Sequence, residues 1–106
     1  MSKIVRHGGL VFLCGQTSSG TKLESIEDQT RHVLANIDAL LAEAGTDKTR
    51  LLQAIIHLRE MGDFAGMNRA WEAWMEPGAA PARTTVQAAL AFPALRVEIT
   101  VVAAAR

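Results

Sequence analysis

Apolar residues follow a helix-like spacing in some segments of the chain and a strand-like spacing in others. The order of these segments limits the fold more than any other feature. Two segments carry apolar residues three or four positions apart, as one face of a helix requires, and strand-like segments precede, separate and follow them. The clearest strand is Leu95–Ala103, in which every second residue is apolar and the positions between include Arg96, Glu98 and Thr100. Such alternation buries one face of a strand and exposes the other.

A hairpin and a loop are predicted at the start of the chain. Lys3–Arg6 and Leu10–Cys14 form the hairpin strands, and His7-Gly8-Gly9 joins them. Glycine supplies the positive φ that tight turns need, so the Gly-Gly pair favours a hairpin here. Residues 15–25 are polar and rich in Ser, Thr and Gly, which indicates a loop.

Two helices are predicted from their apolar spacing and from the signals at their ends. Ser25 and Asp28 form a capping box at the start of the first helix, and Gly45 ends that helix. Asp63 caps the second helix, which Pro77-Gly78 ends. The apolar residues are Val33, Leu34, Ile37, Leu40, Leu41 and Ala44 in the first helix, and Phe64, Met67, Trp71, Trp74 and Met75 in the second.

Two further strands, Leu51–Leu58 and Thr84–Leu90, complete a β-β-α-β-α-β-β order. This α/β (α+β) order predicts one mixed sheet with both helices packed on one face. The residues expected on the buried face of the first of these strands are Leu52, Ala54, Ile56 and Leu58. The apolar residues expected on the uncovered sheet face are Leu51, Ile55, Ala89, Val102 and Ala104. A partly apolar open face predicts a partner subunit.

Length and composition narrow the classes of function. The 106 residues predict one domain, 1–106, and the net charge is zero because eleven basic residues balance eleven acidic ones. No basic excess is available for nucleic acid, and no apolar run is long enough to span a membrane, so neither partner is predicted. The one cysteine, Cys14, forms no internal disulfide and builds no thiolate metal site, which favours a reducing cytoplasm.

Five short motifs stand out along the predicted elements. They are Cys14-Gly15-Gln16-Thr17, Glu27-Asp28-Gln29-Thr30, Asp63-Phe64-Ala65 through Asn68, Pro81-Ala82-Arg83-Thr84-Thr85-Val86, and Val97-Glu98-Ile99. The most specific is Pro-Ala-Arg, whose arginine is followed fifteen residues later by Glu98. In their order and spacing, from about residue 9 to residue 104, the motifs resemble the Rid family, also called the YjgF or L-PSP family.

The resemblance implies a chorismate-mutase-like fold whose four core strands lie in the order 1-4-2-3, with the last strand antiparallel. It also implies a homotrimer with a barrel-like core and one ligand site in each cleft between subunits. Active members hydrolyse reactive 2-iminoacids and enamines to 2-ketoacids and ammonia, without a metal or another cofactor. The predicted partner is therefore a small imine or enamine that carries a carboxylate.

Arg83 and Glu98 are the catalytic candidates that the resemblance provides. An iminoacid carries a carboxylate, which the planar and permanently charged guanidinium of Arg83 can bind through two hydrogen bonds. Hydrolysis needs water at the C=N carbon and a proton at the nitrogen, and a carboxylate such as Glu98 can orient or deprotonate that water. Without the resemblance, each residue has the alternative interpretation of a solvated surface side chain.

The resemblance adds five substrate-binding candidates, which are Cys14, Gly15, Asn68, Trp74 and Thr85. The alternative roles of the first four are a small buried hydrophobe, a turn glycine, a local cap and a core or interface residue. Of the two tryptophans, Trp74 rather than Trp71 is the candidate wall of the site. His7, His32 and His57 share no metal-ligand spacing and are interpreted as structural or surface residues.

Three functions remain open from the sequence. They are an iminoacid or enamine deaminase, a non-catalytic regulatory trimer that binds carboxylate ligands, and a ribonuclease or translation inhibitor. The neutral charge counts against the third, because nucleic-acid affinity depends on phosphate contacts. The pair of Arg83 and Glu98 favours the first function over the second. The family also commonly places an N-terminal tyrosine in the neighbouring subunit's site, whereas this sequence begins almost at the hairpin and contains no tyrosine.

Overall fold

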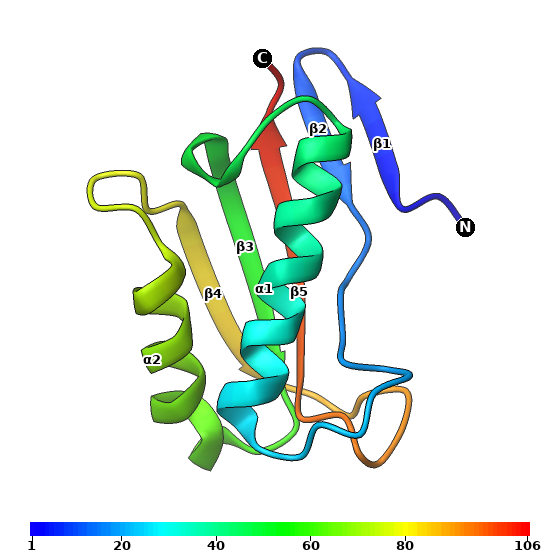
Figure 1. Ribbon diagram of the computed structural model, residues 1–106, viewed down its shortest axis with the longest axis vertical. Coiled ribbons are helices and arrows are strands. Elements are labelled where there is room, and N and C mark those ends of the chain that lie inside the picture. Colours follow the sequence, from blue (N-terminus) through cyan, green and yellow to red (C-terminus); the bar gives the residue numbers. More distant parts are fainter.

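The computed structural model describes all 106 residues as a five-stranded sheet with two α-helices (Figure 1). The strands are β1 (Ile4–His7), β2 (Leu10–Leu13), β3 (Leu51–Leu58), β4 (Ala82–Gln87) and β5 (Val97–Ala104). The helices are α1 (Ile26–Glu43) and α2 (Phe64–Trp74), and the short 3-10 helices are η1 (Lys48–Arg50) and η2 (Met61–Asp63). The predicted order of strands and helices is confirmed.

The sheet is mixed, as predicted, and its strand order is β1-β2-β5-β3-β4. Strand β5 lies antiparallel to both of its neighbours, β2 and β3, whereas β4 pairs with β3 in parallel. When the first hairpin strand is set aside, this is the 1-4-2-3 order with an antiparallel last strand. The last strand therefore lies in the middle of the sheet, and β3 separates it from the edge strand β4.

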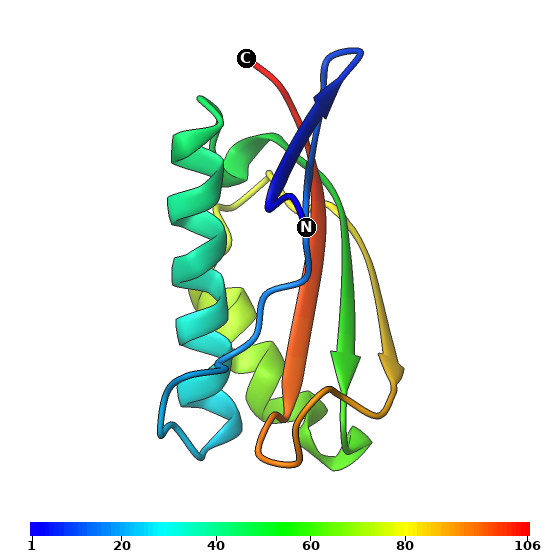
Figure 2. The same cartoon turned by 90° about the vertical axis from the view of Figure 1, so that its right-hand side faces the viewer.

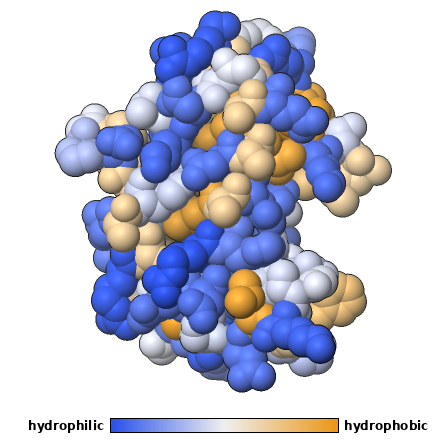
Figure 3. All heavy atoms as spheres, in the orientation of Figure 1, coloured by the Kyte–Doolittle hydropathy of each residue, from blue (hydrophilic) through white to orange (hydrophobic).

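Both helices cover the same face of the sheet and leave the other face uncovered, as Figure 2 shows from the side. Seventeen buried apolar residues form the core between the two layers. On the helix side, Figure 3 shows a mostly hydrophilic surface with hydrophobic atoms in the seam between α1 and α2. On the uncovered sheet face, Val5 and Phe12 are paired across β1 and β2 and remain 49% and 40% exposed. Neither helix is both long and apolar enough to cross a bilayer.

The helix ends follow local signals with one exception. The backbone N–H of Asp28 donates to Ser25 Oγ at 3.1 Å, which confirms the Ser25 half of the predicted capping box, whereas Asp28 Oδ1 accepts a hydrogen bond from Arg31. Gly45 takes a φ of +78° just past the helix end. The prediction that Asp63 caps α2 is wrong, because its side chain makes no cap bond. Instead, the carboxylate of Asp63 accepts two hydrogen bonds from Arg96 at 2.9 and 3.0 Å, which tie the start of α2 to the segment before β5.

An irregularity at the start of β3 changes which leucine is buried. Leu51 is 6% exposed and Leu52 is 47% exposed, the reverse of the prediction. The pairing with β5 shifts between Leu51 and Gln53, and such a bulge takes one residue out of the alternation. Strand β4 also ends at Gln87, earlier than predicted, so Ala89 lies beyond the sheet, and β5 begins two residues later than predicted.

Candidate functional site

Strand β4 presents Arg83 to the helix side of the sheet. Its register partner on β3 is Ala54, which is fully buried under the helices, so both side chains point toward that layer. The guanidinium carbon of Arg83 lies 5.3 Å from the ring centroid of Trp71 and 5.7 Å from that of Phe64, both on α2. Aromatic faces at this distance attract a cation. Arg83 is therefore held at the sheet edge against two aromatic rings.

Arg83 differs from every other arginine of the chain, because its guanidinium makes no hydrogen bond and no ion pair within the chain. The arginines that pair with carboxylates or donate to backbone carbonyls are Arg6, Arg31, Arg50, Arg59, Arg69, Arg96 and Arg106. A guanidinium offers five N–H donors in a planar fork that matches a carboxylate. Arg83 is half-buried and keeps this fork free for an external anion.

Asn68 and Thr85 lie on the same side of the sheet as Arg83. Asn68 stands between Phe64 and Trp71 on one face of α2, and its Oδ1 is buried without a hydrogen-bond partner in the chain. Thr85 follows two residues after Arg83 on β4, so it faces the same way, and its register partner on β3 belongs to the core. These five residues, Phe64, Asn68, Trp71, Arg83 and Thr85, are called the arginine half-site below.

Strand β5 presents Glu98 to the opposite, uncovered face of the sheet. Its neighbours Val97 and Ile99 are fully buried against the helices, so the alternation of the strand turns Glu98 outward. The carboxylate of Glu98 lies against Gly15, where an added Cβ atom would come within 2.7 Å of Glu98 Oε2. The absence of a side chain at Gly15 therefore makes room for this carboxylate.

Cys14 and Gln16 flank this glycine. The backbone of Gln16 exchanges two hydrogen bonds with Ile99, of 2.9 and 3.1 Å, which fix the segment beside β5. Gln16 Nε2 donates to the carbonyl oxygen of Cys14 at 3.1 Å and to its Sγ at 3.3 Å. The thiol is free and half-buried. The four residues Cys14, Gly15, Gln16 and Glu98 are called the glutamate half-site below.

The two half-sites lie on opposite faces of the sheet within one chain. Strand β3 separates the strands that carry Arg83 and Glu98, and the two side chains point to different sides. A ligand bound to Arg83 is therefore separated from Glu98 of the same chain by the packed sheet. The two residues can act on one molecule only when two chains each contribute one of them.

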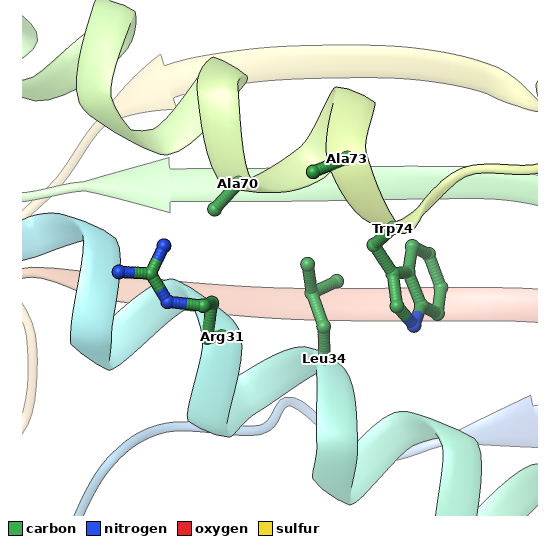
Figure 4. Close-up of a pocket in the computed structure, with 5 residues that line it drawn as sticks. All are labelled: Arg31, Leu34, Ala70, Ala73 and Trp74. Carbon is green, nitrogen blue, oxygen red and sulfur yellow. The ribbon is translucent and has the colours of Figure 1, made fainter.

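Trp74, the expected wall of the site, belongs to neither half-site within one chain. Its indole Nε1 donates to Asp38 of α1 at 2.9 Å, and Lys48 Nζ lies 5.1 Å from its ring centroid. A groove of about 210 Å³ lies between the two helices. Figure 4 shows Trp74 and Leu34 among the side chains that line it. Trp71, one turn earlier on α2, is 3% exposed and takes the place against Arg83.

Phe64 and Trp71 of the arginine half-site, and His57 beside the glutamate half-site, were not identified as site residues from the sequence. Phe64 and Trp71 belong to the apolar stripe of α2, and only the packing of that helix beside β4 reveals that they contact Arg83. His57 lies on β3 in register with Glu98, on the uncovered face, and its Nδ1 is buried without a partner. Strand alternation signals the face of His57, but the strand order is needed to place it next to Glu98.

Asp47 is a charged group whose hydrogen-bond partners lie outside both half-sites. Hydrogen bonds from Thr49 and then from Arg106 lower the pKa of Asp47 to about 2. Asp47 caps η1 and belongs to neither half-site. Nowhere do three or more His, Cys, Asp or Glu side chains come together as a potential metal site. A guanidinium such as that of Arg83 can bind an anion, and a carboxylate such as that of Glu98 can accept a proton.

Comparison with known proteins extends over nearly the whole chain. The family described as Endoribonuclease L-PSP matches residues 1–105. The RutC family protein YoaB of Escherichia coli (strain K12) is 43% identical over 103 residues, which are 97% of this chain and 89% of that protein. A RutC family protein of Haemophilus ducreyi is 39% identical over 103 residues, which are 97% of this chain and 87% of that protein.

Solved structures agree with the sequence comparison. A member of the YjgF protein family from Neisseria meningitidis has a TM-score of 0.95 and 47% identity, covering 100% of this chain and 87% of that chain. A member of the YjgF/YER057c/UK114 family from Mycobacterium tuberculosis has a TM-score of 0.89 and 28% identity, covering 98% of this chain and 86% of that chain. Sequence and fold therefore point to the same relatives.

Proposed function

Because the chain belongs to the endoribonuclease L-PSP family, also called the Rid or YjgF family, we propose that it is a deaminase of reactive imines. Its substrates are small 2-iminoacids or enamines that carry a carboxylate, and its products are a 2-ketoacid and ammonia. The reaction takes place in a cleft where the arginine half-site of one subunit meets the glutamate half-site of another.

The observation that carries this proposal is the free guanidinium of Arg83. It is half-buried, it rests against Trp71 and Phe64, and it bonds to no group of its own chain. A partly desolvated cation without a partner favours a ligand with a compact negative charge. The orphaned Asn68 Oδ1 on the same helix face offers an acceptor for a ligand N–H, such as that of an imine or amine.

Glu98 supplies the group that hydrolysis needs besides carboxylate binding. It accepts a proton from water as the water oxygen bonds to the C=N carbon, and it returns that proton to the nitrogen. It then takes the hydroxyl proton of the carbinolamine and passes it to the nitrogen as the C–N bond breaks, which releases ammonia and the ketoacid. Imines are already reactive, so binding, orientation and one acid–base group suffice.

A homotrimer brings the arginine half-site of one chain and the glutamate half-site of another into one cleft. They lie on opposite faces of one sheet, so a shared site needs a neighbouring chain. The uncovered sheet face also exposes apolar side chains, among them Val5, Phe12 and Val86, which a second copy can cover. In light scattering at micromolar concentration, we expect three times the mass of one chain, and a monomer or dimer would remove the support for the shared cleft.

The test of the activity uses iminoacids made by an amino-acid oxidase and trapped as semicarbazones. With the protein present, we expect less semicarbazone and faster release of ketoacid and ammonia, because enzymatic hydrolysis competes with trapping. Arg69→Ala serves as the matched control for Arg83→Ala, because Arg69 is exposed and paired with Glu27. An unchanged semicarbazone yield with every iminoacid tested would overturn the proposal.

The same preparation distinguishes the two alternative functions. Binding of small carboxylates through Arg83 without any turnover would establish the regulatory trimer. A salt-sensitive, submicromolar complex with RNA would favour the ribonuclease or translation inhibitor. We expect no such complex, because the chain has no net positive charge to neutralise phosphates.

A further inference from the structure

His57 is a polar residue on the uncovered sheet face that belongs to neither half-site. It lies on β3 in register with Glu98 of β5 on one side and with Val86 of β4 on the other. Its strand neighbours Ile56 and Leu58 are fully buried against the helices, so His57 points to the same face as Glu98. Residues directly opposite on antiparallel strands have Cβ atoms about 4.5–5.5 Å apart, so the two side chains are immediate neighbours.

The imidazole ring of His57 makes no hydrogen bond within the chain. Its Nδ1 is buried and has no partner, whereas its Nε2 is not buried. A neutral imidazole carries one N–H, and a buried N–H without an acceptor is destabilising. The proton is therefore favoured on Nε2, which makes His57 a hydrogen-bond donor on the uncovered face.

His57 and Glu98 do not bond to each other directly. The carboxylate of Glu98 lies against Gly15, at the β2 side of β5, whereas His57 lies on the opposite side of that strand. A donor and a carboxylate placed in this way can hold a water molecule between them. Such a water accepts a hydrogen bond from Nε2–H, donates one to the carboxylate and keeps one lone pair for attack.

We propose that His57 is a positioning residue that holds the hydrolytic water against Glu98. The inference rests on the proposed deaminase function and adds the group that orients the nucleophile. The water oxygen forms a bond to the C=N carbon while the π electron pair moves to nitrogen, and Glu98 carries the water proton to that nitrogen. His57 donates a hydrogen bond throughout and exchanges no proton with the substrate.

Three substitutions of His57 show whether its side chain acts as a hydrogen-bond donor through Nε2 or only packs against its neighbours. In His57→Gln the amide nitrogen reaches the place of Nε2, whereas in His57→Asn it reaches only the place of Nδ1. His57→Phe keeps a flat ring without a donor. We expect the Phe and Asn variants to lose roughly 10-fold or more in kcat with little change in KM, because misplaced water lowers the rate of the chemical step. The Gln variant should recover most of the wild-type kcat.

The control is His32→Gln on α1, which lies in the helix layer and should keep the wild-type rate. Light scattering and the thermal midpoint of each variant establish that it folds and assembles. Wild-type hydrolysis together with an unchanged kcat in His57→Phe, or with Asn and Gln variants of equal rate, overturns the role of His57 and leaves the deaminase function intact. Absence of hydrolysis in the wild type overturns the deaminase function and this role with it.

Discussion

The arginine half-site and the glutamate half-site differ in how the chain prepares them. Arg83 lies on the edge strand, on the helix side, and rests against aromatic rings without a bond to its own chain. Glu98 lies on the central strand, on the uncovered side, and its carboxylate occupies the room that Gly15 leaves. The arginine half-site leaves the guanidinium of Arg83 without a bond to its own chain. The glutamate half-site holds the carboxylate of Glu98 beside Gly15.

Under the proposed function, one small sheet supplies both ligand binding and proton transfer, from two charged side chains that do not meet within one chain. Within one chain, the intervening strand β3 and the opposite directions of the two side chains keep the guanidinium of Arg83 apart from the carboxylate of Glu98. In the proposed reaction, this separation leaves the guanidinium available to the substrate carboxylate and the carboxylate of Glu98 available to water. Substitutions at four residues test this division of roles, from the largest expected effect to the smallest.

Removal of the cation should have the largest effect. In Arg83→Ala we expect a loss of about 2–4 kcal/mol, roughly 30- to 1,000-fold in kcat/KM, because a charge-assisted bidentate contact disappears. Arg83→Lys should recover little, since an ammonium cannot reproduce the fork. The measurements are semicarbazide-trapping kinetics and calorimetric binding of a small carboxylate. Equal losses in Arg83→Ala and in the exposed, paired control Arg69→Ala would contradict a specific binding role.

Removal of the base should spare binding. Glu98→Gln nearly keeps the shape of the side chain, so carboxylate ligands should bind as before or more tightly, because a nearby negative charge is gone. We expect kcat to fall roughly 100-fold or more, since the amide cannot accept the water proton. Full activity in this variant would show the mechanism to be wrong, although the family assignment would stand.

Displacement of the base should have a smaller effect. In Gly15→Ala the new methyl group meets the end of the Glu98 side chain, which can move because it is flexible. We expect about a 10-fold lower kcat with nearly the same thermal midpoint, because the carboxylate shifts but remains. Gly62→Ala is the matched control, since no atom lies within 4 Å of a Cβ added there and its φ is not positive. An equal loss of kcat in both variants would show that the contact with Gly15 does not position the carboxylate of Glu98.

Loss of an aromatic face beside Arg83 should have the smallest effect. Phe64→Leu keeps an apolar side chain but removes the ring face, which is worth about 0.5–1 kcal/mol at a partly exposed site, or roughly two- to five-fold in carboxylate affinity. Phe92→Leu, in the loop between β4 and β5, is the control, because that ring is 56% exposed and has no arginine over it. If both variants bind alike, the ring does not help to hold the guanidinium.

Local signals in the sequence were sufficient for most of the fold. The period-2 pattern found β3 and β5, and the helical spacing with Ser25 and Gly45 found α1. The errors arose where the structure departs from a regular local rule. The bulge between Leu51 and Gln53 exchanges the buried leucine, and Asp63 bonds Arg96 instead of capping its helix. Both depend on partners that are distant in sequence.

Less of the candidate site than of the fold could be predicted from the sequence, because the position of the site residues relative to one another depends on the strand order. The motifs identified Arg83 and Glu98, but the alternation of each strand does not reveal that the two side chains face opposite sides. That result needs the register of β4 on β3 and of β3 on β5. The same register places His57 beside Glu98, and the packing of α2 selects Trp71 rather than Trp74 as the neighbour of Arg83.

The most direct test of the shared cleft is complementation between two inactive variants. Arg83→Ala and Glu98→Gln chains are unfolded, mixed in equal amounts and refolded together, with each variant refolded alone as the control. In a trimer whose clefts take Arg83 from one chain and Glu98 from the next, about a quarter of the clefts receive both native residues. We therefore expect about a quarter of the wild-type rate from the mixture and almost none from either variant alone. A mixture no more active than the separate variants, in trimers shown to contain both chains, would contradict a site shared between subunits.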